Sequence, residues 1–355
     1  GTECEPYISA DDTVMQCYAK EIVEGAEILA HMVGAENVIL AVEDNKPDAA
    51  EAMAKAAEAL DIADVVTFPT KYPSGGEKQL IEILFDMQVP SGGIPADIGI
   101  LCQNPSTAIA VRDALIDGKP LTDRITTVTG MSLQNPGNRR VMLGTPICEL
   151  LSDAAFDDSA ADRVIHGGPM MGFAVTDLDM PVVKITNCVL APTRTEIPPP
   201  QPQQACIRCG MCAEACPASL LPQQLYWYAR AKDNEQLERH NLLDCIECGA
   251  CAYVCPSHIP LVQYYRSAKG AIREAAKEKV RSDNSRVRFE ARQERLEREA
   301  AAKEAKRAAR KAAAEARAKS GDDPVQAAIE RAKAKKDAQA QTATEEQKVT
   351  EENAQ

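Results

Sequence analysis

Apolar residues in the first third of the chain follow two alternating periods. A spacing of three or four residues predicts a helix that begins near Asp11 and Asp12 and ends at Gly34. The continuous apolar run at 37–42 predicts a buried strand. Further along, the same alternation predicts helices at 47–60, 77–87 and 105–116 and strands at 64–68 and 97–102. Such alternation is typical of a parallel sheet flanked by helices, so the predicted fold class is α/β, with a Rossmann-like sheet over 1–119.

Beyond this region the pattern becomes one of short strands separated by turns. Apolar runs at 125–130 and 182–191, with a short helix at 147–151 between them, predict a small β-grasp module. We place this module and its return strand at 120–195. Residues 196–204 are rich in proline and predict an extended linker.

The last part of the chain is polar and rich in alanine. Residues 266–320 have high helix propensity but no sustained heptad seam, so we expect a basic helix there and a disordered tail over 321–355. The stretch 266–320 carries 18 Lys and Arg against 9 Asp and Glu, in a chain of net charge −13. Disorder throughout is the alternative on composition, and docking to an acidic partner or an anionic lipid surface is the functional interpretation.

Composition narrows the class of protein and its compartment. The 355 residues are 45% hydrophobic and 4% aromatic, which is typical of a globular α/β chain of two or three domains. No apolar run reaches the roughly 18 residues of a membrane-spanning helix, and no signal peptide is visible. Of the 13 cysteines, five are scattered singly, which indicates a reducing compartment. No nucleic-acid motif accompanies the basic stretch, so we expect no nucleic-acid partner.

Two copies of one pattern carry the most specific chemistry, CIRCGMCAEACP at 206–217 and CIECGACAYVCP at 245–256. In the spacing C-x2-C-x2-C-x3-C-P, three cysteines bind one [4Fe-4S] cluster and the fourth binds the cluster of the other copy. The predicted ligands are Cys206, Cys209, Cys212 and Cys255 for cluster one, and Cys216, Cys245, Cys248 and Cys251 for cluster two. The copies lie 39 residues apart, which indicates an internal duplication and a two-cluster ferredoxin-like helical domain over 205–265.

Structural zinc is the alternative interpretation of these cysteines. Zinc is held by thiolates in closed pairs, and a cysteine triple with a distant fourth is not its usual pattern. Gly210 and Gly249 give the backbone freedom where it passes the cluster, and the prolines after each motif turn the chain away. A pair of clusters carries single electrons, so we expect a two-electron cofactor on the α/β domain.

Three polar loops are candidates for that cofactor: GTECEPY at 1–7, PSGGEK at 73–78 and CQNPST at 102–107. Each lies where a predicted strand ends or a helix begins, the place where phosphate and flavin groups bind in open α/β sheets. The dinucleotide fingerprint G-x-G-x-x-G is absent, and ordinary turns are the alternative on residues alone. The glycine and methionine loop GGPMMG at 167–172 is interpreted as a structural turn.

In this order, GTECEPYISADD, GGEK, QNPSTA, GNRR with GTP, GGPMMG and the doubled cysteine motif resemble the C subunit of the Rnf-type ion-translocating ferredoxin:NAD oxidoreductases. The resemblance covers nearly all of residues 1–265. This family is similar to the flavin-bearing NADH-oxidising subunit of respiratory complex I. The resemblance implies FMN and NAD(H) at the α/β domain, a β-grasp module that is of the soluble-ligand-binding type, and two [4Fe-4S] clusters. It also implies a further domain and a glycine-rich loop ahead of Gly1, so we expect an N-terminally truncated chain with an incomplete flavin site.

Residue by residue, the resemblance assigns cofactor contacts to the three polar loops. The implied residues are Glu3, Glu5 and Tyr7 beside flavin and nicotinamide, with the Cys4 backbone nearby, Gly76 and Glu77 at the isoalloxazine and nucleotide, and Asn104 and Thr107 at ribityl and phosphate. No catalytic acid or base is expected, because hydride transfer depends on the stacking and orientation of the cofactors.

The resemblance implies a peripheral electron-transfer subunit on the cytoplasmic side of a bacterial inner membrane, with no transmembrane segment of its own. It would pass electrons between NAD(H)/FMN and ferredoxin-type iron-sulfur partners, as part of a translocase whose other subunits move the ion. An electron relay or scaffold without its own flavin site is the alternative. An iron-sulfur subunit of the fumarate reductase or heterodisulfide type is a third, and would lack GTECEPY and GGPMMG.

Overall fold

The computed structural model describes residues 1–320 and 325–338. The chain divides into two units, residues 1–273 and 274–355. Unit one holds the α/β part, a second sheet and the cysteine motifs, whereas the described part of unit two is helical.

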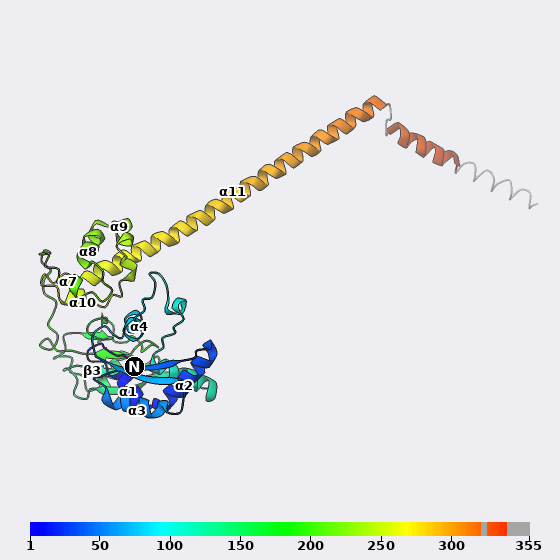
Figure 1. The fold of residues 1–355 in the computed structure, drawn as a ribbon. Helices are drawn as coiled ribbons and strands as arrows, with labels where there is room; N and C mark the ends of the chain where they lie inside the picture. Colours follow the sequence, from blue (N-terminus) through cyan, green and yellow to red (C-terminus); the bar gives the residue numbers. More distant parts are fainter. Residues whose placement is uncertain (321–324, 339–355) are drawn as a thin grey trace, which may run out of the picture. The chain divides into compact units, whose positions relative to one another are not determined.

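The α/β part alternates helices and strands as the periodicity predicts. Its elements are α1 (Ala10–Cys17), α2 (Ala19–Val33), β1 (Val38–Glu43), α3 (Pro47–Ala57), β2 (Ala63–Phe68), α4 (Glu77–Phe85), the 3-10 turn η1 (Pro95–Ile98) and α5 (Pro105–Ile116) (Figure 1). β1 and β2 pair in parallel, from Val38 with Ala63 to Glu43 with Phe68. Val42 of β1 packs with buried residues of α1, α2 and α3. The α/β class with a parallel sheet is confirmed.

The first predicted helix is divided in two. The sequence predicts one helix from Asp11 to Gly34, but the chain breaks at Tyr18, where φ is −131° and ψ is 30°. The predicted end is confirmed, since Gly34 has φ 69° and closes α2 in the left-handed conformation that glycine tolerates.

The strand predicted at 97–102 is wrong. Pro95–Ile98 form η1, and Gly99 ends it with φ 79°, a backbone conformation that does not continue into a strand. Leu101 lies exposed, so the apolar run there does not bury its side chains in a sheet. Across the residues that the structure describes, the parallel sheet consists of β1 and β2.

Helices α2 and α5 approach closely at Gly25. A Cβ at this position would lie 2.0 Å from the Ala108 carbonyl oxygen. We therefore expect Gly25→Ala to lower the free energy of unfolding by about 1–3 kcal/mol, because the backbone of α5 must shift. Gly270→Ala is the matched control: Gly270 is also helical, nothing lies within 4 Å of its Cβ position, and alanine there should be neutral or slightly stabilising. Urea unfolding of both variants checks this, and equal effects would contradict it.

The second sheet forms the module that follows. Its elements are β3 (Asp123–Thr129), β4 (Gly137–Met142), α6 (Ile147–Asp153), β5 (Val164–His166), β6 (Phe173–Val175) and β7 (Cys188–Leu190). The strand order is β4-β3-β7-β5-β6, with β3 and β7 parallel and the other pairs antiparallel. Buried Ile147, Leu150 and Leu151 of α6 pack against Val189 of the sheet. The module is thus a small mixed sheet with one packed helix, and its assignment as a β-grasp module over 120–195 stays a prediction.

The strand predicted at 182–191 is shorter than expected, because only Cys188–Leu190 join the sheet. Thr186 explains the difference. Its side-chain Oγ1 accepts from the Val183 amide at 2.9 Å, and its carbonyl accepts from Thr126 Oγ1 at 3.0 Å. These local hydrogen bonds hold the chain in a turn, where the predicted strand would have needed backbone hydrogen bonds to a neighbouring strand.

A side-chain network joins the α/β part to the second sheet. Asn138 of β4 donates from Nδ2 to Thr13 Oγ1 at 2.6 Å and to the Ser9 carbonyl at 3.0 Å, and its Oδ1 accepts from Thr127 Oγ1 at 2.7 Å. The Ser9 amide in turn donates to Thr127 Oγ1 at 3.1 Å. The network fixes the start of α1, and with it the N-terminal loop, against the sheet.

The cysteine-rich part is built from short helices. These are α7 (Met211–Glu214), α8 (Pro222–Ala231), α9 (Asn234–Arg239), η2 (Leu242–Asp244), α10 (Ala250–Tyr253) and the first turns of α11 (Leu261–Ser320) (Figure 1). Tyr226, Leu237, Leu242 and Tyr265 are buried among them. Because Ala268 and Ile272 of α11 pack into the same core, packing continues past residue 265, the predicted end of this domain.

Unit two continues α11 to Ser320, and the side chains of residues 274–318 are mostly exposed and rich in charge. Ion pairs on the helix surface, such as Arg286 Nη2 with Asp283 Oδ1 at 3.2 Å, fit the solvent-exposed basic helix that the sequence predicts. Residues 325–338 are also helical, which differs from the disorder predicted for 321–355; high helix propensity outweighs the low apolar content there. The rest of that predicted tail, 321–324 and 339–355, lies outside the described residues. None of the described helices combines the length and apolarity that crossing a membrane requires.

Candidate cofactor sites

The eight motif cysteines line two separate cavities. Cys216, Cys245, Cys248 and Cys251 surround one, and Cys206, Cys209, Cys212 and Cys255 surround the other. The cavities have nearly equal volumes, about 380 and 390 Å³ including space open to solvent, as a duplicated site should. In each set the fourth cysteine comes from the other motif copy. The structure thus groups the thiols in the crossed sets that the spacing predicts, and their role as cluster ligands stays a prediction.

The two motifs fold alike, which is why they form matched cavities. Gly210 and Gly249 have φ 86° and 83° and begin the one-turn helices α7 and α10. Two residues earlier, Arg208 and Glu247 have φ 59° and 60°. A left-handed residue followed by a left-handed glycine turns each loop around its cavity.

The thiols fit a cluster better than a single ion. A single zinc ion needs its sulfur ligands about 2.3 Å from one point. Within residues 1–320 and 325–338, no three metal-ligating side chains converge in a way that could hold one metal ion. Burial raises the pKa of the Cys251 thiol to about 12, and the neighbouring motif cysteines add to the shift. Burial therefore favours the neutral thiol of Cys251, and binding it as a thiolate together with the other three cysteines of its set needs a cationic centre that reaches all four, which a [4Fe-4S] cube supplies.

The second set of cysteines contacts the α/β part directly. Tyr72 donates its hydroxyl to the Cys248 carbonyl at 2.5 Å, and Ser91 Oγ donates to Asp244 at 2.6 Å. A Cβ on Gly249 would lie 3.0 Å from the Met170 carbonyl, so the glycine lets the 167–172 loop approach the motif. The cavity of the second set is therefore the one joined to the predicted flavin domain.

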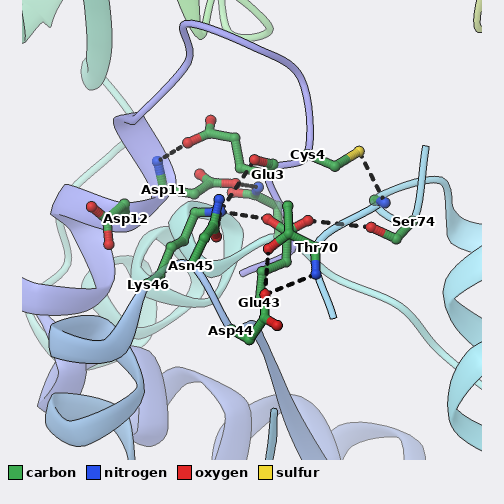
Figure 2. Close-up of polar contacts among 12 residues, drawn as sticks. Glu3, Cys4, Asp11, Asp12, Glu43, Asp44, Asn45, Lys46, Thr70 and Ser74 are labelled. Carbon is green, nitrogen blue, oxygen red and sulfur yellow. Dashed lines mark hydrogen bonds and ion pairs between the residues drawn. The ribbon is translucent and has the colours of Figure 1, made fainter. Parts of the chain in front are cut away.

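A buried polar cluster lies where β1 ends, at the edge expected for a ligand in an α/β sheet. Figure 2 shows Glu43 and Lys46 turned toward each other beside the N-terminal loop. Lys46 Nζ donates to the Glu43 carboxylate, to the Glu3 carbonyl at 3.2 Å and to Asn45 Oδ1 at 3.1 Å. Ser74 Oγ donates to the other oxygen of Glu43 at 3.2 Å. The cluster therefore holds the loop 1–7 to the end of β1.

Glu3 does not present a free carboxylate. Its Oε2 accepts from the Asp11 amide at 3.0 Å, near the start of α1. Asp11 in turn accepts from Asn104 Nδ2 at 2.6 Å, and Asn104 Oδ1 caps α5 by accepting from the Ser106 amide at 2.9 Å. This chain of hydrogen bonds brings the loops 1–7 and 102–107 together.

The carboxyl group of Glu3 makes stability depend on pH. Burial, together with the Asp11 carboxylate, raises the pKa of Glu3 from 4.5 to about 8. Between these values the folded chain holds a proton that the unfolded chain has lost, so the free energy of unfolding should fall as pH rises from about 4.5 to 8. Glu3→Gln should flatten this part of the profile, measured by urea unfolding at several pH values. An unchanged slope, equal to that of a variant at exposed Glu27, would contradict the assignment.

Glu5 is held by the glycine and methionine loop. Its Oε1 accepts from the backbone amides of Met170 at 2.7 Å and Met171 at 3.1 Å. A Cβ on Gly168 would lie 2.1 Å from Glu5 Cγ, so only glycine leaves room for this contact. The loop predicted as a structural turn is therefore an anchor for a predicted flavin-site residue.

The remaining predicted contacts are only partly brought together. Cys4 Sγ accepts from the Gly75 amide at 3.2 Å, which places loop 73–78 beside loop 1–7. Gly76 is the N-cap of α4, and Glu77 is its exposed first residue. Thr107 lies exposed in the first turn of α5. Tyr7, the last residue of loop 1–7, is exposed; partial desolvation and the Glu196 carboxylate raise its pKa.

The sequence did not predict Glu43, Lys46, Tyr72 and Ser74 as members of the site. A signal for the first two was present, because charged residues follow the apolar run of β1 directly, at its carboxyl end. Ser74 lies in the candidate loop 73–78, but its partner Glu43 is distant in the sequence. Tyr72 carried no such signal, since its partner Cys248 is also distant.

The α/β part also has features that fit FMN. α4 and α5 begin with backbone amides at the loops 73–78 and 102–107, and helix N-termini favour phosphate. Gln79 Oε1, beside Gly76, is buried with no hydrogen-bond partner among the described residues. A buried acceptor of this kind calls for a donor that a polar ligand can supply.

Comparison with known protein families identifies both the α/β part and the cysteine-rich part. Residues 1–113 match the family described as Nuo51 FMN-binding domain, and residues 205–259 match the 4Fe-4S dicluster domain. The chain therefore combines a flavin-type domain with a two-cluster domain, the combination that defines the class of iron-sulfur flavoproteins.

The relatives narrow this class. The chain is 55% identical over 303 residues to the C subunit of the ion-translocating oxidoreductase complex of Erwinia tasmaniensis, covering 85% of this chain and 38% of that protein. The corresponding protein of Citrobacter koseri is 55% identical over 302 residues, with 85% and 43% covered, and that of Salmonella gallinarum is 54% identical, with 85% and 45% covered. Over 85% of its length the chain is homologous to these C subunits of ion-translocating oxidoreductase complexes, and it spans less than half the length of these relatives.

A solved structure shares the fold. An NAD+-reducing [NiFe]-hydrogenase in its H2-reduced state matches with a TM-score of 0.50 at 17% identity, covering 74% of this chain and 55% of that chain. At this identity the likeness shows the fold alone.

Proposed function

We propose that the chain is a peripheral electron-transfer subunit of a membrane-bound ion-translocating oxidoreductase. It passes electrons between NAD(H)/FMN and ferredoxin-type iron-sulfur partners through two [4Fe-4S] clusters, on the cytoplasmic side of a bacterial inner membrane. Ion translocation is assigned to the other subunits, so the enzyme is the assembled translocase. One observation carries the proposal: two matched cysteine cavities lie in the same unit as an FMN-type domain, and one of them contacts it through Tyr72.

The residues have distinct parts in this proposal. When bound, FMN supplies the conversion between two-electron hydride transfer with NAD(H) and transfer of single electrons. The loops with Glu3, Cys4, Glu5, Gly76, Glu77, Asn104 and Thr107 would hold it. Tyr7 has the weakest geometric support, because its exposed side chain interacts with Glu196. Lys46 and the amides of the 167–172 loop keep two of these loops in place. The eight motif cysteines would hold the clusters.

Cofactor content tests the proposal. The chain is purified anaerobically, reconstituted with iron, sulfide and FMN, and freed of excess by gel filtration. We expect about eight irons per chain and, because the resemblance implies an incomplete flavin site, at most one FMN. Eight irons without FMN would support the alternative, an electron relay without its own flavin site. Zinc in place of iron would overturn both the flavoprotein and the relay. Replacing a predicted FMN contact, as in Glu77→Gln, should weaken FMN retention. Glu27→Gln, at an exposed residue of α2, is the matched control and should not.

A further inference from the structure

The two motif copies have the same ligands but different charges around them. At the third position of the motif, copy one has Arg208 and copy two has Glu247, and both residues adopt the same left-handed backbone. Arg208 is exposed to solvent, whereas Glu247 is half-buried and paired. The duplication therefore preserved the thiols while the electrostatic surroundings of the two sites diverged.

Lys269 is the buried cation of the second site. It is 4% exposed, and its Nζ donates to the Cys245 carbonyl at 2.5 Å and to Glu247 Oε1 at 2.9 Å. Arg266 donates to the other oxygen of Glu247 at 2.7 Å from the protein surface. Both cations lie on the first turns of α11, where Tyr265 also lines the cavity. These turns of α11 are therefore a wall of the second cysteine site.

The charge of Lys269 reaches the cysteine ligand. The carbonyl that accepts from its Nζ belongs to Cys245, one of the four predicted ligands in this cavity. Two cations and one carboxylate leave the group with a net charge of +1 beside the cavity. Water screens a buried charge poorly, so its field acts on whatever the cavity holds.

We infer that Lys269 sets the reduction potential of the cluster held by Cys216, Cys245, Cys248 and Cys251. Reduction adds one negative charge to a cluster, and a fixed positive charge beside it stabilises the reduced form. The site of Cys206, Cys209, Cys212 and Cys255 has no contact with Lys269 in the described structure and keeps its potential when Lys269 is replaced. This inference rests on the proposed clusters.

Variants of opposite sign separate an electrostatic role from a structural one. Lys269→Met removes the positive charge and should lower the potential of one cluster. Glu247→Gln removes the negative charge and should raise the potential of the same cluster. Lys269→Arg keeps the charge and should restore most of the original value. A residue that only stabilises the fold would shift both sites in one direction or lower the iron content.

The experiment is a redox titration of the full chain, reconstituted with iron and sulfide and followed by electron paramagnetic resonance. Lys269→Met should change the reduction equilibrium of one signal at least tenfold, which is about 59 mV for one electron. The signal that moves should be the one that Cys216→Ser removes. Lys277→Met, 67% exposed on the same helix, is the control and should move neither signal.

The outcomes are distinct. Normal iron with no shift, equal shifts of both signals, or shifts of the same sign in Lys269→Met and Glu247→Gln would each overturn the role of Lys269. A chain that takes up no iron would instead refute the proposed function on which the inference rests.

Discussion

Replacing Cys216 with serine is expected to remove one whole cluster, although the other three predicted ligands of that cluster lie in the second motif. The iron content should fall from about eight to about four per chain. The reason is the crossed geometry, in which Cys216 lines the cavity of Cys245, Cys248 and Cys251. Iron and sulfide analysis after anaerobic reconstitution measures the effect.

Double variants make this prediction specific to the crossing. Cys216→Ser with Cys248→Ser should retain about four irons, because both belong to one set, whereas Cys216→Ser with Cys209→Ser should retain almost none. If each motif held its own cluster, the two double variants would exchange results. Cys148→Ser, at a lone cysteine of helix α6, is the control and should keep about eight irons.

Replacing Lys46 with methionine is expected to produce the largest loss of stability in the α/β part. Glu43 is fully buried, and Lys46 is its cationic partner. Removing one partner of a buried pair leaves an uncompensated charge, so the free energy of unfolding should fall by about 3–5 kcal/mol. Urea unfolding followed by circular dichroism measures the change.

Two controls accompany the Lys46 variant. Lys46→Met with Glu43→Gln removes the orphaned charge and should recover much of the loss. Lys20→Met breaks a pair with Glu24 in which Lys20 is 83% exposed, and should cost no more than about 1 kcal/mol. A Lys46→Met variant as stable as Lys20→Met would show that the buried pair is not needed.

Local features of the structure could be predicted from the sequence because they depend on neighbouring residues. Apolar periodicity identified α3, β1, β2 and α5, whose core faces repeat within a few residues. The same pattern failed at 97–102, because an apolar run makes a strand only where a sheet is there to bury it, and the chain turns at Gly99. Cysteine spacing identified the crossed thiol sets for the same reason: each triple is set by one short loop.

Long-range partners could not be predicted. Glu5 finds its amide donors at Met170, and Tyr72 finds its acceptor at Cys248, across more than 160 residues in each case. In the sequence, Lys269 is indistinguishable from the other cations of the basic stretch, yet in the structure it is buried at the start of α11. Only the packing of separate elements decides which polar side chains meet.

The most direct test of the account is the visible absorbance of the clusters when NADH is added to the anaerobic chain reconstituted with iron, sulfide and FMN. We expect NADH to bleach the absorbance of a chain with about eight irons, and we expect the bleaching to be lost when FMN is omitted. Dithionite should bleach the clusters in both samples. Absorbance that dithionite bleaches and NADH leaves unchanged, in a chain with bound FMN, would contradict the proposed passage of electrons between NAD(H) and the clusters.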